Sequence, residues 1–232
     1  MLPFMTIPDQ GFLVSEIFDS IEGEGKRAGQ LATFIRLNGC NLHCSYCDTA
    51  YAQDMLKNCE VTQVQDILNN IRCKNVTITG GEPLMHYKTL PSLLTALNNL
   101  QHQYHEVNIE SNGSMPINDY LRFSNVFFTL DYKCKSSGMN GSMYLPNFEQ
   151  VRAKDVVKFV VGSVEDLEEA ADVYTHFFLS RLKGNVYLSP VFGKITPAEI
   201  VDFMKRPKYE KFDWRLQLQL HKYIWNPEKR GV

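Results

Sequence analysis

Three cysteines lie within eight residues of one another in the segment GCNLHCSYCDT. Cys40, Cys44 and Cys47 are separated by three and two residues, and one loop with this spacing can aim three thiolates at a single metal centre. A structural zinc site takes four protein ligands, and the nearest fourth candidate, His43, is adjacent to Cys44, which makes simultaneous ligation awkward. Three thiolates suit a [4Fe-4S] cluster in which one iron stays open to a small-molecule ligand.

A zinc knuckle and three adventitious thiols are the other interpretations of this segment. The c-type haem signature is excluded because Asp48, and not a histidine, follows Cys47. An open iron can bind S-adenosylmethionine (SAM) through its amine and carboxylate and pass it the electron that cleaves its sulfonium bond. The other cysteines, Cys59, Cys73 and Cys134, are scattered, and we expect them to be buried small hydrophobic residues.

A second motif, Thr79-Gly80-Gly81-Glu82-Pro83, follows the apolar run at 75–79. Paired glycines let the main chain approach a ligand closely, and Glu82 can accept hydrogen bonds from a cationic amine. Alone, two glycines after a strand are usually only a turn. Beside the cysteine segment, the motif indicates a site for a cationic amine and not merely a turn.

These two motifs resemble those of the radical SAM superfamily, and further segments narrow the family. The segment SIEGEG at 20–25 leads into FIRLNGC at 34–40, and this combination is similar to the 7-carboxy-7-deazaguanine synthase family. Further matches are CDT at 47–49, ESNG at 110–113, DYK at 131–133, SSGM at 136–139 and QLHK at 219–222. The resemblance extends from about residue 13 to the C-terminus.

The resemblance implies an activity and its cofactors. Members of this family are radical SAM lyases that convert 6-carboxy-5,6,7,8-tetrahydropterin to 7-carboxy-7-deazaguanine with loss of ammonia, in queuosine and 7-deazapurine biosynthesis. They use a [4Fe-4S] cluster, use SAM catalytically and need Mg²⁺. The resemblance also implies an external electron donor, such as a flavodoxin or ferredoxin, and a homodimer.

By motif position, the resemblance also implies the residues of the site. Cys40, Cys44 and Cys47 are the expected cluster ligands, and Thr49 is the expected Mg²⁺ ligand. The residues expected to border SAM are Tyr46, Cys47, Asp48, Gly81, Glu82, Ser111, Asp131, Tyr132, Lys133 and, as a weaker candidate, Ser189. The residues expected to line the substrate pocket are Ile21, Glu22, Gly23, Glu24, Arg36, Thr79, His221 and Pro227.

The chemistry of the substrate makes two of these residue types reasonable. The pterin presents a guanidine-like edge of N–H donors, which the Glu24 carboxylate can accept, and its carboxylate matches the planar fork of Arg36. The alternative to substrate binding is that Glu24 and Arg36 only form an internal ion pair. Many members of the family carry glutamine in place of Glu22, and an ionised carboxylate there needs a donor as its partner. Because the chain continues past Pro227, the resemblance assigns no role to a terminal carboxylate at this proline.

The elements that must position these residues alternate between strands and helices. Apolar, β-rich runs recur at 32–37, 75–79, 106–111, 125–133, 155–161, 185–190 and 214–220. Apolar residues recur at helical spacing between 61 and 71, between 90 and 100, and between 167 and 178. In the first of these ranges, Thr62 and Gln65 resemble a capping box. The segment Thr196-Pro197-Ala198-Glu199 begins another helix.

Such alternation predicts parallel strands joined by right-handed crossovers. The connection between 111 and 125 is too short for a full helix, so we expect an incomplete, open α/β barrel with mostly parallel strands. Ligands bind at the carboxyl ends of such strands, where the cysteine segment and the GGEP turn both lie. We expect a single domain over residues 1–232, with a substrate-pocket segment at 12–30 and a pocket-closing tail at 214–232.

Composition limits the classes of function. Hydrophobic residues make up 44% of the 232-residue chain and charged residues 22%, which is typical of a soluble globular protein. The 24 basic and 26 acidic residues leave a net charge of −2, which argues against nucleic acid or an anionic membrane as partner. No apolar stretch is long enough to span a membrane, and the start MLPFMTIPDQ does not resemble a secretory signal, so we expect a cytoplasmic protein. Alternatives to a deazaguanine synthase are a glycyl-radical activase and a zinc-stapled binding module.

Overall fold

The computed structural model describes residues 10–55, 57, 59–100, 106–227 and 229–232. Residues 1–9, which make up most of the start MLPFMTIPDQ, lie outside the described residues. The strands are β1 (Phe12–Ile21), β2 (Leu31–Leu37), β3 (Glu60–Thr62), β4 (Asn75–Gly80), β5 (Val107–Ser111), β6 (Val126–Tyr132), β7 (Val156–Val161), β8 (Val186–Pro190) and β9 (Arg215–Leu216). The α-helices are α1 (Val64–Asn69), α2 (Leu90–Asn99), α3 (Pro146–Gln150), α4 (Val164–His176), α5 (Pro197–Met204) and α6 (His221–Ile224).

The strands form one sheet in the order β3-β1-β2-β4-β5-β6-β7-β8-β9. Every neighbouring pair from β2 to β9 is parallel, whereas β1 pairs antiparallel with both β2 and β3. Among the described strands, β3 and β9 are the two ends of the sheet and do not pair with each other, so the barrel stays open. The prediction of an incomplete α/β barrel with mostly parallel strands is confirmed.

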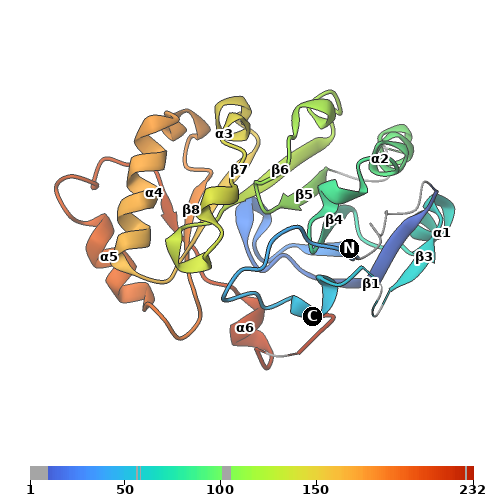
Figure 1. Ribbon diagram of the computed structural model, residues 1–232, viewed down its shortest axis with the longest axis horizontal. Coiled ribbons are helices and arrows are strands. Elements are labelled where there is room, and N and C mark those ends of the chain that lie inside the picture. The colour runs from blue at the N-terminus through green and yellow to red at the C-terminus, as the bar shows by residue number, and fades with distance from the viewer. Residues whose placement is uncertain (1–9, 56, 58, 101–105, 228) are drawn as a thin grey trace, which may run out of the picture.

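Helices α1 to α5 lie along the outside of the curved sheet, and α6 lies apart from them, below the sheet in the view of Figure 1. Side chains along a strand alternate between its two faces, so each parallel strand sends one set of residues toward the helices and the other to the inside. In β6, for example, Phe128, Leu130 and Tyr132 belong to the hydrophobic core, whereas Thr129 and Asp131 line the inside. The core therefore lies between the sheet and its outer helices.

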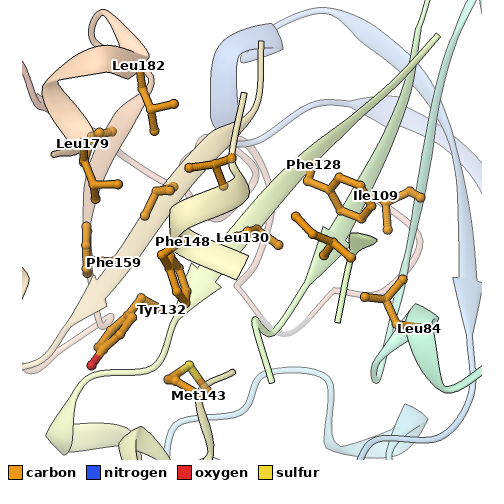
Figure 2. Close-up of a cluster of buried hydrophobic side chains, with 14 of the residues drawn as sticks. Leu84, Ile109, Phe128, Leu130, Tyr132, Met143, Phe148, Phe159, Leu179 and Leu182 are labelled. Atoms are coloured by element: carbon orange, nitrogen blue, oxygen red, sulfur yellow. The ribbon is translucent and has the colours of Figure 1, made fainter. Parts of the chain in front are cut away.

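Figure 2 shows this core between β6, β7 and α3. The ring of Phe148, on α3, lies 5.3 Å from the ring of Tyr132, which in turn lies 5.6 Å from that of Phe159. Phe148 and Phe159 are fully buried and Tyr132 is 7% exposed. Because the side chain of Tyr132 packs here, it points away from the inside of the barrel.

Side chains cap the starts of two helices, and the sequence pattern predicted the first of these starts. Thr196 and Glu199 form a reciprocal capping box at the start of α5, with Pro197 in the first helical turn. Ser163 caps α4 by accepting a hydrogen bond from the backbone N–H of Asp166. As expected, the connection from 111 to 125 holds only a short 3-10 turn, at Asn118–Tyr120.

Other details of the sequence analysis are wrong. Residues 60–62 form a strand, so the predicted helix and its capping box at Thr62 are displaced: α1 begins after Gln63 and has no side-chain cap. The expected strand at 214–220 shortens to Arg215–Leu216, because the next residues turn toward the N-terminal segment. Phe178 is 76% exposed and adopts a left-handed backbone, so it lies outside the helical stripe. Of the scattered cysteines, Cys134 is buried, but Cys59 and Cys73 are only half-buried.

Within the described part of the chain, no helix combines the length and apolar character needed to cross a membrane.

Candidate active site

A cavity of about 810 Å³ lies inside the open barrel, at the carboxyl ends of the parallel strands. This volume falls in the upper part of the range for small-molecule sites and leaves room for more than one small ligand. The cysteine loop after β2 and the GGEP turn after β4 both reach it, as the strand order predicts.

Strand alternation places one polar side chain on the inner face of six successive parallel strands. These residues are Arg36 on β2, Thr79 on β4, Glu110 on β5, Asp131 on β6, Lys158 on β7 and Ser189 on β8. All of them except Ser189 line the cavity. The Thr79 hydroxyl donates to Glu110 at 2.9 Å, so neighbouring strands also connect through these side chains.

A buried ion network lies at the floor of the cavity. The Lys158 ammonium is 3.0 Å from Glu24 and 3.8 Å from Asp131, and Asp131 is 2.7 Å from Lys133. Burial lowers the pKa of Lys158, but the Glu24 and Asp131 carboxylates outweigh this effect and hold the pKa above its usual value. Burial raises the pKa of Glu24, but the Lys158 ammonium and the hydrogen bonds to Glu24 outweigh this effect. The pKa of Glu24 is therefore below its usual value. Both Lys158 and Glu24 are therefore charged at neutral pH.

The loop that carries the three cysteines packs against the loop that follows β6. The Ser45 backbone N–H and hydroxyl donate to the carbonyls of Ser137 and Ser136, at 3.0 and 2.6 Å, and the Tyr46 hydroxyl donates to the carbonyl of Val160 at 3.2 Å. Ser45 and Tyr46 thereby fix this part of the loop against β7 and the loop after β6. Cys40, Cys44 and Cys47 all line the cavity and are all half-buried.

The spacing of the three sulfur atoms distinguishes a cluster from a single ion. Zn²⁺ bonded to three sulfurs at about 2.3 Å would hold them about 4 Å apart. The sulfur atoms of Cys40, Cys44 and Cys47 do not form a group within 4.8 Å of one another. Thiolates bound to three different irons of a [4Fe-4S] cluster lie farther apart, so these residues fit the cluster better than zinc. Burial raises the pKa of Cys44, and the Lys133 ammonium acts in the opposite direction by favouring the thiolate.

The GGEP turn lies so close to the cysteine loop that only glycine fits. A Cβ atom on Gly81 would be 2.2 Å from the carbonyl oxygen of Gly39, and one on Gly80 would be 1.9 Å from that of Leu37. Gly80 also has φ +144°, which side chains disfavour. The N–H groups of Gly81 and Glu82 donate to the carbonyls of Leu37 and Gly39. The GGEP turn and the cysteine loop are therefore joined through their backbones.

Glu82 itself lies behind this turn. Its carboxylate is fully buried and accepts hydrogen bonds from Leu84 N–H, Asn112 N–H and the Ser111 hydroxyl. Burial raises its pKa to about 7, against the lowering effect of these donors. Its contacts therefore hold Asn112 and Ser111 in place at the cavity wall.

The segment SIEGEG enters the cavity from the end of β1. Glu22 is 2% exposed and accepts hydrogen bonds on its Oε1 atom from Arg27, at 2.5 Å, and from the Thr77 hydroxyl. Gly23 makes room for the His221 ring, because a Cβ atom there would be 2.2 Å from its Nδ1 atom. Burial lowers the pKa of His221, which favours the neutral ring.

Arg36, on β2, also lines the cavity, and part of its guanidinium is already hydrogen-bonded. Its Nε atom donates to Glu16 at 2.6 Å, and Glu16 also accepts from the Tyr51 hydroxyl at 2.7 Å. The guanidinium lies 5.6 Å from the centre of the Phe18 ring and 5.9 Å from that of Tyr51. An internal ion pair therefore exists, and it orients the guanidinium in the cavity wall.

Residues after β9 complete the cavity wall. The Gln217 carboxamide bonds the backbone of Gly25, and the N–H of Leu220 donates to the carbonyl of Gly23. Lys222 lies 3.1 Å from Asp48, and the Arg230 guanidinium lies 3.8 Å from the centre of the Tyr51 ring. These contacts bring the N-terminal segment, the cysteine loop and the chain end to one cavity.

The structure thus brings together most of the residues that the sequence analysis selected. The cavity is lined by Ile21, Glu22, Gly23, Glu24, Arg36, Thr79, His221 and Pro227, and by Tyr46, Cys47, Asp48, Thr49, Gly81, Ser111, Asp131 and Lys133. Glu82, Tyr132 and Ser189 do not line it. Ser189 lies beneath the floor, where its hydroxyl donates to Glu24 at 2.7 Å.

The sequence analysis missed several residues of the site. Lys158 carries the charge at the cavity floor, and its signal was a single lysine within the apolar run VVKFVV. Glu110 and Asn112 lay within a quoted motif but received no role, although strand alternation after Ile109 would have placed Glu110 on the inside. Arg27 had no sequence signal, because its partner Glu22 becomes its neighbour only through the turn that follows β1.

Comparison with known proteins agrees with this geometry. The model of the Radical SAM superfamily matches residues 34–132, which contain both the cysteine loop and the GGEP turn. The crystal structure of QueE from Escherichia coli has the same fold, with a TM-score of 0.67 and 23% sequence identity over 89% of this chain and 93% of that one. The class is therefore that of the radical SAM proteins, which hold a [4Fe-4S] cluster and SAM.

Two curated relatives define the family more narrowly. A 7-carboxy-7-deazaguanine synthase from Clostridium acetobutylicum is 47% identical over 95% of this chain and 99% of its own length. One from Methanospirillum hungatei is 34% identical over 94% of this chain and 87% of its own length. This chain belongs to the 7-carboxy-7-deazaguanine synthase family, as the resemblance of its motifs indicated.

The close approach of the two loops gives the first prediction. Gly81→Ala should push Gly39 away from its position and displace Cys40, because overpacking of this kind costs about 1–3 kcal/mol. We expect less iron per chain after anaerobic reconstitution and a lower affinity for SAM. Gly141→Ala is the matched control, because a Cβ atom there meets nothing within 4 Å. Equal iron content in the two variants would show that the two loops are not joined as described.

Proposed function

We propose that this chain is a 7-carboxy-7-deazaguanine synthase that converts 6-carboxy-5,6,7,8-tetrahydropterin to 7-carboxy-7-deazaguanine and ammonia. The observation that carries the proposal is that one cavity holds both the cluster cysteines and the SIEGEG segment with Arg36. The 47% identical relative bears this enzyme name and aligns over nearly the whole chain. The conversion removes one nitrogen as ammonia and involves no net oxidation, so it consumes no redox co-substrate.

Cys40, Cys44 and Cys47 would hold the cluster, and the cavity wall formed by Tyr46, Gly81 and Ser111 would border SAM. When bound, these groups supply an electron that cleaves the sulfonium bond and so produce the radical that starts the ring contraction. The protein supplies the orientation of the substrate and the exclusion of water. The buried walls and the charged floor of the cavity suit both tasks.

The carboxypterin would be recognised by those polar groups of the cavity that can still donate or accept a hydrogen bond. Arg36 gives its Nε atom to Glu16, which leaves its other guanidinium nitrogens to bind the substrate carboxylate. Among the described residues, both donors to Glu22 bond its Oε1 atom, and Oε2 is left to accept from the N–H edge of the pterin. Glu24 already accepts from Ser189, Lys158 and Gln219, so it offers at most one further acceptor site.

We propose that Thr49 contributes to a Mg²⁺ site that forms together with the substrate. Its hydroxyl lines the cavity and donates to Asp48 at 3.0 Å. Mg²⁺ prefers oxygen ligands in octahedral geometry and keeps some of its waters. One hydroxyl is a poor site alone, but the carboxylate and ring carbonyl of the substrate would complete the shell. The metal would then bind mainly when substrate is present.

The finer features implied by the family belong to the same proposal. A reduced flavodoxin or ferredoxin would provide the electron, the protein would act as a homodimer, and the reaction would take place in the cytoplasm. Pro227 and the residues after it would close the pocket from the chain end. The N-terminal segment 12–30 would supply the opposite wall within a single domain.

The test of the proposed function is an anaerobic assay of the reconstituted, reduced protein with the carboxypterin, SAM and Mg²⁺. The expected result is 7-carboxy-7-deazaguanine and an equal amount of ammonia, with SAM recovered at the end. Cys44→Ala should lose iron and all product, whereas Cys59→Ala should keep both. Full iron content and activity in Cys44→Ala would contradict the cluster assignment, and a colourless protein that binds zinc and forms no product would contradict the enzyme.

Arg36→Ala should weaken substrate binding while iron content and slow SAM cleavage without substrate persist. Loss of one partner of a buried charged pair typically costs about 2–5 kcal/mol, or roughly 30-fold to several thousand-fold in Kd for the carboxypterin. Arg122→Ala is the control, because Arg122 is exposed and its guanidinium lies 5.1 Å from the centre of the Phe123 ring. Glu16→Gln, which keeps an oxygen acceptor for Arg36, should weaken binding far less. If Glu16→Gln weakens binding as much as Arg36→Ala does, Arg36 only serves the internal pair.

Thr49→Ala should keep the cluster and SAM but lose most of the stimulation of turnover by Mg²⁺, because the metal loses its protein ligand. The measurement is the initial rate of product formation over a Mg²⁺ titration. Thr95→Ala, an exposed threonine in α2, provides the control. A Mg²⁺ dependence that is the same in Thr49→Ala and wild type would refute the ligand role and leave Thr49 as a local partner of Asp48.

A further inference from the structure

Asn112 lies directly after β5 and bonds the cysteine loop through its side chain. Its Nδ2 atom is 3.7 Å from the Cys40 sulfur and 3.1 Å from the Asn41 side-chain oxygen. The residue is only 7% exposed, so little water competes for these contacts. None of the roles proposed above uses this side chain.

The orientation of the Asn112 carboxamide is fixed from the other end. Its Oδ1 atom accepts from both the N–H and the hydroxyl of Ser114, at 3.0 and 2.6 Å. Because both bonds need an oxygen acceptor, the nitrogen must be the atom that faces Cys40. The Ser114 hydroxyl also accepts from Asn41 at 2.8 Å, which closes a ring of hydrogen bonds beside the sulfur.

The backbone of the same residue reaches the GGEP turn. The Asn112 N–H donates to Glu82 Oε2 at 2.7 Å, and the fully buried Glu82 also accepts from Ser111 and Leu84. Asn112 therefore connects a cluster ligand to the turn that borders SAM. A second N–H, from the Leu42 backbone, lies 3.5 Å from the Cys40 sulfur, so that sulfur has two donors.

Hydrogen bonds to the thiolates of an iron–sulfur cluster stabilise their negative charge. Reduction adds one more negative charge to the cluster, so a donor beside a thiolate favours the reduced state and raises the reduction potential. Burial strengthens the effect, because the local dielectric constant is lower than that of water.

We infer that Asn112 is a positioning residue that tunes the reduction potential of the cluster through its bond to the Cys40 thiolate. The inference rests on the proposed function only in that the three cysteines hold a cluster. It concerns how readily the cluster accepts its electron, and not which substrate follows. If Asn112 were purely structural, its replacement would change the cluster content and the stability of the protein. The reduction potential of the clusters that do assemble would stay unchanged.

The test is the midpoint potential of the cluster, measured by anaerobic redox titration with electron paramagnetic resonance detection. The signal comes only from chains that hold a cluster, so incomplete folding or loading of a variant does not affect the midpoint. Asn112→Ala removes the donor without adding charge. Asn112→Asp keeps the acceptor for Ser114 and replaces the donor with an oxygen.

Both variants should have lower potentials than wild type. We expect a roughly three- to tenfold shift of the reduction equilibrium in Asn112→Ala, which is about 30–60 mV for one electron, and a larger shift in Asn112→Asp. The matched control is Asn41→Asp, which adds the same charge to the neighbouring cysteine loop at an exposed position and keeps an acceptor for Asn112. It should shift the potential less than either Asn112 variant.

The possible outcomes separate the inference from the proposed function. Lower potentials in both Asn112 variants, with a smaller change in Asn41→Asp, would support it. A wild-type potential in Asn112→Ala, or an equal shift in Asn41→Asp and Asn112→Asp, would overturn it and leave a structural role or a general charge effect. Failure of the wild-type protein to assemble any cluster would instead overturn the proposed function.

Discussion

The buried Lys158 ammonium is the contact on which the arrangement of the site depends. It lies between Glu24, from the segment after β1, and Asp131, on β6, and Asp131 in turn bonds Lys133. Unpaired charges at this depth are unstable, and removal of one partner of such a pair costs about 3–5 kcal/mol. The N-terminal segment must therefore stay against the sheet for these charges to be neutralised. The result is one cavity whose lining includes both the SIEGEG segment and the cysteine loop.

The wall formed by the cysteine loop and the GGEP turn is rigid for a different reason. The backbones of the GGEP turn and of the cysteine loop are so close that Gly81 has no room for a side chain, and their N–H and carbonyl groups bond each other. Asn112 then connects the two loops to the end of β5. Rigid support of this kind suits a reaction in which a reactive radical must meet one hydrogen atom of the substrate, because small displacements of the reacting groups reduce rates strongly.

Much of this could be predicted from the sequence, because motifs and strand periodicity are local signals. The cysteine spacing, the GGEP turn after β4 and the predicted parallel direction of the strands indicated that both loops lie at the same edge of the sheet. The antiparallel pairing of β1 was missed, because the sequence analysis interpreted residues 12–30 only as a segment of the substrate pocket and did not predict a strand there. Arg27 and Lys158 were missed for a different reason: each is explained by a partner, Glu22 or Glu24, that becomes a neighbour only in the folded chain. Glu82 was expected to face a ligand, but its three donors are visible only in the structure.

The central claim is that a single cavity holds SAM on the cysteine side and the carboxypterin on the SIEGEG side at the same time. The most direct test is anaerobic calorimetric titration of the reconstituted protein with the carboxypterin, in the presence and absence of saturating SAM. The account predicts one carboxypterin bound per chain in both cases, with equal or higher affinity when SAM is present. Displacement of one compound by the other, or binding of the carboxypterin to a protein that lacks the SIEGEG side chains, would contradict it.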